Sequence, residues 1–203
     1  VMKEMKLLFF IIIAYFLGSL PSGVWIGKIT KNIDIRNYGS KNSGATNAYR
    51  ILGAKYGLMV LFADALKGFL AVALAAAGGL SPNAVSIVAL VVILGHSLSF
   101  FLAFKGGKGV ATSLGVFLFL EPKVTFLLIF IFIAVVFVSR YISLGSIIAA
   151  GLLPILTFWV EIGKEKTNWL LIFITLLLGA FVVYRHKSNI IRLLEGKENK
   201  FKL

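Results

Sequence analysis

Two short segments of the chain combine lysine, glycine and hydroxyl or amide side chains in a pattern typical of anion-binding loops. They are GSKNSGATN at residues 39–47 and KGGKGVATS at residues 105–113. Glycines let a backbone approach a ligand closely and arrange successive N–H groups around an anion. Each segment precedes an expected helix, whose first turn adds unpaired N–H groups and a partial positive charge. The pattern therefore predicts two phosphate-binding loops.

The residues of these two loops supply the donors that a phosphate group needs. The candidate ligands are Ser40, Lys41, Asn42, Gly44, Thr46, Asn47 and Arg50 in the first loop, and Lys105, Gly106, Gly107, Lys108, Gly109 and Thr112 in the second. The alternative is that the lysines are only topology anchors or contacts with anionic lipid. Anchoring requires neither glycines nor asparagines, so the combination favours a ligand. No Walker A or G-x-G-x-x-G motif occurs, so nucleotide binding is not expected. A nucleic acid is not expected as a partner either.

The composition indicates the class of protein that carries these loops. Apolar residues make up 59% of the 203 residues and charged residues 14%, with a mean hydropathy of +0.96. Soluble domains contain about a quarter charged residues, so the composition predicts an integral membrane protein. The absence of cysteine excludes disulfides, a cysteine nucleophile and thiolate metal sites. With two histidines and eight acidic residues, neither a metal ion nor another cofactor is expected.

Seven apolar segments are long enough, or nearly so, to form membrane helices. They are Leu7–Ile29, Gly53–Leu80, Ala84–Phe104, Val110–Leu120, Val124–Val138, Leu144–Val160 and Trp169–Tyr184. The fourth is short and is compatible with a re-entrant helix as well as with a crossing. The expected architecture is an all-α bundle of seven transmembrane helices, which forms a single transmembrane domain over residues 1–203.

The distribution of positive charge predicts the orientation of this bundle. With seven crossings, one face collects both loops, Arg140 and the tail from Arg185, and carries fifteen of the 21 Lys and Arg residues. The opposite face carries five. Because positive residues concentrate on the cytoplasmic side, we expect the N-terminus outside, the C-terminus in the cytoplasm and both loops on the cytoplasmic face.

Two further polar segments fall on the same face. SRYISLGS at residues 139–146 contains Arg140 and Ser143, and YRHKSNIIRLLEG at residues 184–196 contains His186 and Asn189. His186 and Asn189 are three residues apart and share a face if the helix continues. An amphipathic, basic helix that lies on the lipid surface is the alternative for the second segment.

Charged and polar residues also occur inside the expected spans. Asp64 and Lys67 lie one helical turn apart. We expect an ion pair that faces the bundle, because charges inside a span are costly, and a role in proton transfer is the alternative. His96 is expected to form a hydrogen bond between helices, with ligand binding as the alternative.

Five segments together resemble the bacterial acyl-phosphate:glycerol-3-phosphate acyltransferase family, whose members are membrane enzymes. The segments are GSLPSGVWIGK, DIRNYGSKNSGATNAYRILG, GHSLSFFLAFKGGKGVATSLG, SRYISLGS and RHKSNIIRLLEGKE. They follow the order seen in the family and extend from about Leu17 to Glu198. The resemblance implies a monomeric enzyme of the bacterial inner membrane, surrounded by membrane lipids, with its active site on the cytoplasmic face.

The resemblance also implies a reaction. A long-chain acyl group would pass from acyl phosphate to the sn-1 hydroxyl of glycerol 3-phosphate, giving 1-acyl-glycerol-3-phosphate (lysophosphatidate) and inorganic phosphate. This is the first acylation in phospholipid synthesis. The H-x-x-x-x-D motif of other glycerolipid acyltransferases is absent, because Phe101 and Ile191 occupy the fifth position after the two histidines. The hypothesis is therefore direct attack without an acyl-enzyme.

Roles follow for individual residues on this hypothesis. Lys105, Arg50 and the glycine-rich backbones would hold the phosphates, and Ser143, His186 and Asn189 would orient glycerol 3-phosphate. Either His186 or a phosphate oxygen of the donor would take the hydroxyl proton, and either loop could hold either phosphate. The residues alone leave acyl-CoA and acyl-carrier-protein donors open.

Two other classes of protein explain less of the sequence. A transporter for an anionic phosphate compound would need a polar path through the membrane and usually an internal repeat, whereas the chain offers only Asp64 and Lys67 near mid-membrane and no detectable repeat. A lipid-binding scaffold would account for the basic face but not for the glycines, asparagines and threonines of the loops.

Overall fold

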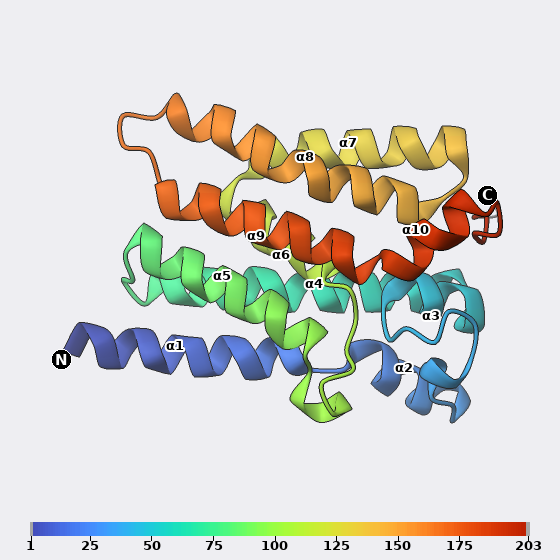
Figure 1. Cartoon of the computed structure of the whole chain (residues 1–203). Coiled ribbons are helices and arrows are strands. Elements are labelled where there is room, and N and C mark those ends of the chain that lie inside the picture. Colours follow the sequence, from blue (N-terminus) through green and yellow to red (C-terminus); the bar gives the residue numbers. More distant parts are fainter. Residues whose placement is uncertain (1, 202–203) are drawn as a thin grey trace. The chain divides into compact units, whose positions relative to one another are not determined.

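The computed structural model describes residues 2–201, which form ten α helices and two short 3-10 helices and contain no strand (Figure 1). The prediction of an all-α fold is thereby confirmed for the described residues. The helices group into two compact units, Val1–Leu120 and Glu121–Leu203. The assignment of the whole chain to a single domain stays a prediction.

Four helices that lie side by side form the body of the first unit (Figure 1). They are α1 (Met2–Ser19), α4 (Ala54–Ala77), α5 (Pro82–Ser97) and α6 (Val110–Leu120). Shorter elements complete the unit: α2 (Ser22–Lys31), η1 (Ile35–Asn37), α3 (Ala45–Leu52) and η2 (Phe100–Leu102).

Small residues bring these helices into backbone contact. A Cβ atom at Gly115 would overlap the carbonyl of Ala65, and one at Gly68 would overlap the carbonyl of Thr112, so α4 and α6 cross at very short range. Gly18 packs in the same way on α5. Membrane helices associate through such small residues, because lipid offers no hydrophobic driving force between helices.

The first expected span is interrupted at Pro21. Helix α1 ends at Ser19 and α2 begins at Ser22, since proline has no N–H group and its ring clashes with the preceding turn. The break leaves carbonyl oxygens inside the unit, and side chains satisfy them. Lys67 Nζ donates to Leu20 O at 2.8 Å, and Ser99 Oγ donates to Ser19 O at 2.6 Å.

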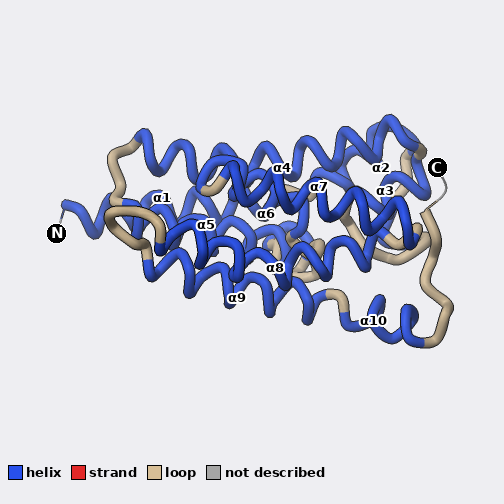
Figure 2. Tube along the Cα trace, turned by 90° about the horizontal axis from the view of Figure 1, so that it is seen from above, coloured by secondary structure: helices blue, strands red, loops and turns tan. Residues whose placement is uncertain are grey.

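Three long helices and one short helix form the second unit. They are α7 (Pro122–Ser139), α8 (Ile142–Ile162), α9 (Trp169–Arg185) and α10 (Lys187–Leu194). Helix α8 packs against both α7 and α9. The axis of α10 departs from that of α9 by 57°, a bend that Figure 2 shows at the end of α9.

Five helical segments of the described chain are long and apolar enough to cross a membrane, and the bent pair α9 and α10 would make a sixth. Helix α6 has 11 residues, which span about 16 Å against the roughly 30 Å of a hydrocarbon core. Apart from Lys123 in the first turn, the side chains that α7 exposes are apolar, Phe126, Phe130 and Phe137 among them. The protein is therefore membrane-embedded, whereas seven crossings remain a prediction.

Candidate active site

The first loop is organised around the side chain of Asn47, which is 1% exposed. Its Nδ2 group lies within hydrogen-bonding distance of the carbonyls of Ile35, Tyr38 and Asn42, at 2.8–3.2 Å. Its Oδ1 atom accepts a hydrogen bond from Ser40 N at 2.9 Å. This amide holds the loop together and is not directed at a ligand, unlike the role expected from the sequence.

Other members of the first loop remain available to solvent. Lys41 is exposed and adopts a left-handed backbone conformation, with φ +55°. Asn42 Oδ1 accepts a hydrogen bond from Gly44 N, the N-cap residue of α3. Thr46 and Arg50 lie half-buried on α3. The sequence suggested an irregular loop as far as Arg50, whereas the helix begins at Ala45. Thr46, Asn47 and Arg50 therefore lie on α3, and the other candidates precede it.

An ion pair anchors the entry to this loop. The guanidinium of Arg36 contacts both carboxylate oxygens of Asp34, with Nη2 2.7 Å from Oδ2. Asp34 Oδ1 also accepts a hydrogen bond from the backbone N–H of Arg36. These hydrogen bonds hold the pKa of Asp34 below its usual value. Asp34 is therefore held as a carboxylate that fixes the entry to the loop.

The second loop is tied to the end of α5 by its own backbone. Gly106 N donates to Ser97 O at 3.1 Å and Gly107 N donates to His96 O at 3.2 Å. Those two N–H groups are directed at protein carbonyls, although the sequence suggested that they would face an anion. Both residues are glycine because a Cβ atom would overlap His96, whereas Gly109 is glycine because its φ is +87°.

The remaining donors of the second loop lie at the start of α6. The helix begins at Val110 and its first turn closes through Ser113 N and Gly109 O, at 2.8 Å, so the N–H groups before Ser113 point out of the helix end. The Thr112 hydroxyl is fully buried and has no hydrogen-bond partner, which is uncommon for a buried polar group. Lys105 is exposed and Lys108 is half-buried.

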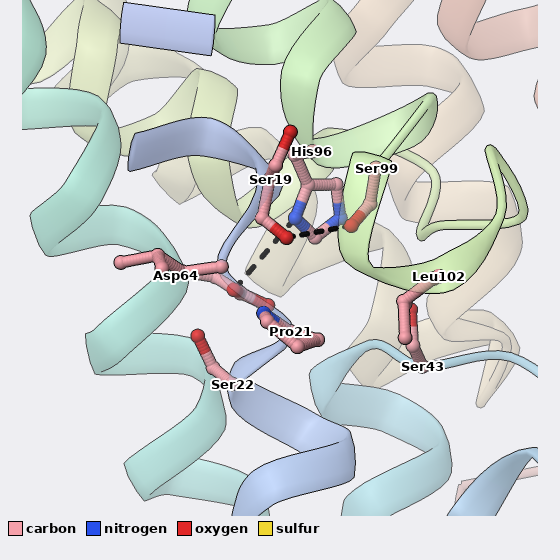
Figure 3. Close-up of a pocket in the computed structure, with 9 residues that line it drawn as sticks. Ser19, Pro21, Ser22, Ser43, Asp64, His96, Ser99 and Leu102 are labelled. Carbon is pink, nitrogen blue, oxygen red and sulfur yellow. Dashed lines mark hydrogen bonds and ion pairs between the residues drawn. The ribbon is translucent and has the colours of Figure 1, made fainter. Parts of the chain in front are cut away.

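A small pocket lies between the two loops (Figure 3). Ser43 reaches it from the first loop, and His96, Ser99 and Leu102 reach it from the segment before the second. Its remaining lining residues come from α4 and from the break between α1 and α2: Ser19, Leu20, Pro21, Ser22 and Asp64. Its free volume of about 10 Å³ is enough for about one water molecule. The two loops therefore lie on the same part of the first unit.

Three titratable side chains meet at the wall of this pocket. Lys67 Nζ lies 2.7 Å from Asp64 Oδ1, which confirms the expected ion pair. His96 Nδ1 lies 3.7 Å from the same oxygen (Figure 3). This separation is longer than a hydrogen bond, so the contact between α5 and α4 is electrostatic, and the hydrogen bond expected for His96 stays a prediction.

In the second unit, His186 occupies the bend between α9 and α10 and is 3% exposed. Its Nδ1 atom lies 2.8 Å from Val182 O. A carbonyl oxygen can only accept, so Nδ1 carries the proton of the neutral ring and Nε2 carries the lone pair. This tautomer suits a proton acceptor.

Asn189 lies one turn after His186, as the spacing predicted, and it is 5% exposed. Asn189 Nδ2 donates to Glu198 Oε1 at 2.9 Å, and Arg192 Nε donates to Glu198 Oε2 at 2.7 Å. Glu198 is itself 6% exposed and was not singled out in the sequence. The signal that could have found it is Gly196, whose φ of +67° turns the chain back after α10.

The remaining predicted site residues also lie in the second unit. Arg140 is the C-cap residue of α7, and its φ is +66°. Its carbonyl accepts a hydrogen bond from Phe201 N. Its guanidinium lies 5.9 Å from the ring centroid of Phe137. Ser143 is 6% exposed at the start of α8, and its hydroxyl has no hydrogen-bond partner. The start of α8 thus holds a buried hydroxyl without a partner, and the bend between α9 and α10 holds a buried histidine.

The fold and these sites define a membrane-embedded, all-helical protein with two cationic, glycine-rich loops. The sequence model of the family described as "Glycerol-3-phosphate acyltransferase" matches residues 8–196, and the chain belongs to that family.

The relatives agree over nearly the full length of the chain. The glycerol-3-phosphate acyltransferase of Fusobacterium nucleatum subsp. nucleatum is 55% identical over 193 residues, which cover 95% of this chain and 97% of that protein. The one of Trichlorobacter lovleyi is 49% identical over 195 residues, covering 96% and 97%.

Two solved structures have the same fold. They are crystal structures of PlsY (YgiH), an integral membrane glycerol 3-phosphate acyltransferase. The glycerol 3-phosphate form superposes with a TM-score of 0.87 at 39% identity, covering 97% of this chain and 96% of that one. The lysophosphatidic acid form gives 0.85 at 38% identity, covering 97% and 95%.

Proposed function

We propose that the protein transfers a long-chain acyl group from acyl phosphate to the sn-1 hydroxyl of glycerol 3-phosphate. The products are lysophosphatidate and inorganic phosphate, and the reaction begins phospholipid synthesis. The observation that supports the proposal is the pair of cationic loops in the first unit. Ser43 of the first loop lines the same pocket as His96, Ser99 and Leu102, which precede the second loop. Two loops suit a reaction in which the donor and the acceptor each carry a phosphate group.

The proposal assigns particular groups to these phosphates. In the second loop they are the exposed ammonium of Lys105, the N–H groups at the start of α6 and the Thr112 hydroxyl. In the first loop they are Lys41, Thr46 and Arg50. A helix start with nearby cations binds phosphate through unpaired N–H groups and a partial positive charge. The amide of Asn47 and the N–H groups of Gly106 and Gly107 contribute by shaping the loops.

The chemistry is the transfer of an acyl group from a mixed anhydride to an alcohol. The sn-1 oxygen of glycerol 3-phosphate forms a bond with the acyl carbon, and the bond from that carbon to the donor's phosphate oxygen breaks. The hydroxyl proton passes to His186 Nε2 or to a phosphate oxygen of the donor. Phosphate is a good leaving group, so the protein needs chiefly to orient the reactants, which can supply about 7–11 kcal/mol, and to stabilise the oxyanion. No acyl-enzyme is formed.

Residues of the second unit complete the proposal. Ser143, His186 and Asn189 would orient glycerol 3-phosphate, with Arg140 as a further cation. The protein would act as a monomer in the bacterial inner membrane, with seven crossings and its N-terminus outside. The loops and the C-terminus would lie on the cytoplasmic face, because that face would carry most of the positive charge.

The experiment that tests the reaction uses purified protein, glycerol 3-phosphate and either palmitoyl phosphate or palmitoyl-CoA, with lysophosphatidate measured as the product. We expect product from palmitoyl phosphate alone, and little product after Lys105→Ala. The control is Lys166→Ala, which removes an exposed lysine between α8 and α9. Product from palmitoyl-CoA would overturn the donor assignment, and no product from either donor would overturn the proposed reaction.

A further inference from the structure

The imidazole of His96 packs directly against the second loop. A Cβ atom on Gly107 would overlap His96 Nε2, and a Cβ atom on Gly106 would overlap the carbonyl oxygen of His96. Neither glycine has a positive φ, so the backbone conformation does not require glycine there. The two glycines are needed because the loop backbone packs against this one histidine.

The opposite edge of the ring faces a charged group. His96 Nδ1 is 3.7 Å from Asp64 Oδ1, and Asp64 is held by Lys67 Nζ at 2.7 Å (Figure 3). Lys67 is held in turn by Leu20 O. All three side chains are at least nine-tenths buried. The ring is therefore fixed between a carboxylate anchored in α4 and the backbone of the second loop.

We infer that His96, oriented by Asp64, is a positioning residue for the loop of residues 105–109. The carbonyl of His96 accepts a hydrogen bond from Gly107 N, and that of Ser97 accepts one from Gly106 N. The imidazole of His96 packs against Gly107. This arrangement fixes where Lys105 and the start of α6 lie. On this inference His96 acts through the loop.

The consequence for activity rests on the proposed function, whereas the contact itself does not. If the loop binds a phosphate, its donors must be held in place before the ligand arrives, because ordering a flexible loop on binding weakens affinity. Loss of the imidazole should therefore raise the KM of the substrate whose phosphate the loop holds. The kcat should change much less.

The first test is hydrogen exchange of the Gly106 and Gly107 amides in detergent-solubilised protein, and it needs no catalysis. We expect His96→Ala to accelerate exchange at both amides by about tenfold or more, since their acceptors lie on the loosened segment. His96→Asn, which keeps an N–H group near Asp64, should restore part of the protection. Ser86→Ala removes another buried polar side chain of α5, and it should leave both amides unchanged.

The second test is a double-mutant cycle with Gly107→Ala, in which KM is measured for glycerol 3-phosphate and for palmitoyl phosphate. We expect each single variant to raise one of the two KM values by about tenfold. In the His96→Ala background the new methyl group enters the space of the lost ring. Gly107→Ala should then add less than about threefold.

The outcomes separate this inference from the proposed function. Unchanged exchange in His96→Ala, or KM effects of the two variants that simply multiply, would overturn the positioning role. A loss confined to kcat or to the yield of folded protein, with both KM values unchanged, would also overturn it. A wild-type protein without activity would overturn the proposed reaction, while accelerated exchange in His96→Ala would still support the positioning role.

Discussion

Lys67 Nζ lies 2.7 Å from Asp64 Oδ1 within α4, a helix long and apolar enough to cross a membrane, and both residues are at least 96% buried. Their spacing of one helical turn predicted this pair. The structure adds two contacts that the spacing did not predict, from Lys67 to Leu20 O and from Asp64 to His96. The pair therefore joins α4 to the break after α1 and to the end of α5.

Removing one member of this pair should be far more damaging than replacing both. We expect Asp64→Ala to lower the free energy of unfolding by about 3–5 kcal/mol, because it leaves a buried ammonium without its carboxylate. The double variant with Asp64→Leu and Lys67→Met should recover much of that loss. Thermal unfolding in detergent measures the stability of both variants. A double variant whose loss of stability equals the sum of the two single losses would contradict the prediction.

The crossing of α4 and α6 should not tolerate a methyl group. Gly115→Ala places a Cβ atom on the carbonyl of Ala65, and we expect it to be destabilised by about 1–3 kcal/mol through overpacking. Gly151→Ala is the matched control, because a Cβ atom there meets nothing within 4 Å. Because Gly151 lies inside a helix, its replacement by alanine should raise the free energy of unfolding by up to about 1 kcal/mol. Equal melting temperatures for the two variants would contradict this account.

The buried cluster at the C-terminal end of the chain should depend on Glu198. Its carboxylate accepts hydrogen bonds from Asn189 and Arg192. We expect Glu198→Ala to cost about 1–3 kcal/mol, because it removes the acceptor of buried Asn189 and half-buried Arg192. It should also accelerate proteolysis after residue 194. Glu198→Gln keeps an acceptor for Asn189 and should be milder. A control is Glu195→Ala, since that side chain is exposed. Similar proteolysis of Glu198→Ala and Glu195→Ala would contradict the role of Glu198.

The sequence predicted features that depend on composition and local periodicity. Apolar segments and the Asp64–Lys67 pair were predictable, because each follows from hydrophobicity or helical spacing. A shared face for His186 and Asn189 required the helix to continue, whereas α9 ends at Arg185 and α10 departs from its axis by 57°. The sequence did not predict that the Gly106 N–H group donates to a protein carbonyl and not to a ligand. Whether a loop N–H faces a ligand or a carbonyl depends on where α5 ends relative to the loop, which is a tertiary relationship.

Residues that act across long stretches of sequence were the hardest to predict. Asn47 resembled a ligand, yet its amide is occupied by three carbonyls and one N–H group of its own loop. Glu198 looked like one charge in a solvated tail, but the turn at Gly196 carries it back to Asn189. In both cases a polar side chain pairs with hydrogen-bonding groups of its own protein: backbone groups for Asn47 and side-chain donors for Glu198. Composition alone gives no signal of such pairing.

A carboxylate at the start of α7 should give the stability of the protein a pH dependence. Burial raises the pKa of Glu121, which faces Glu161 and Lys164. Burial alone would lower the pKa of Lys164, but its hydrogen bonds to both carboxylates raise it overall. Because the pKa of Glu121 is higher in the folded state, its protonated form stabilises the fold. This contribution to the free energy of unfolding is complete below the unfolded pKa of about 4.5. It is lost as the pH rises through the folded pKa.

Glu121→Gln removes this titration while keeping an acceptor for Lys164. We therefore expect the melting temperature of the variant, relative to wild type, to increase between about pH 4 and pH 8. Glu165→Gln provides the control, because its carboxylate is exposed in the loop after α8. A difference between Glu121→Gln and wild type that is constant over this range, or that shrinks, would contradict the assignment.

The last prediction concerns the proton acceptor. The hydrogen bond from His186 Nδ1 to Val182 O fixes the tautomer in which Nε2 carries the lone pair. We expect His186→Ala to lower kcat for lysophosphatidate formation by about 10²–10⁴-fold, the usual contribution of a general base. Added imidazole should restore part of the rate, since the small base can enter the space of the lost ring. Ser188→Ala, at an exposed neighbour on α10, should be close to wild type. A near-normal kcat in His186→Ala would assign the proton to the donor's phosphate oxygen, leaving His186 to hold the bend between α9 and α10.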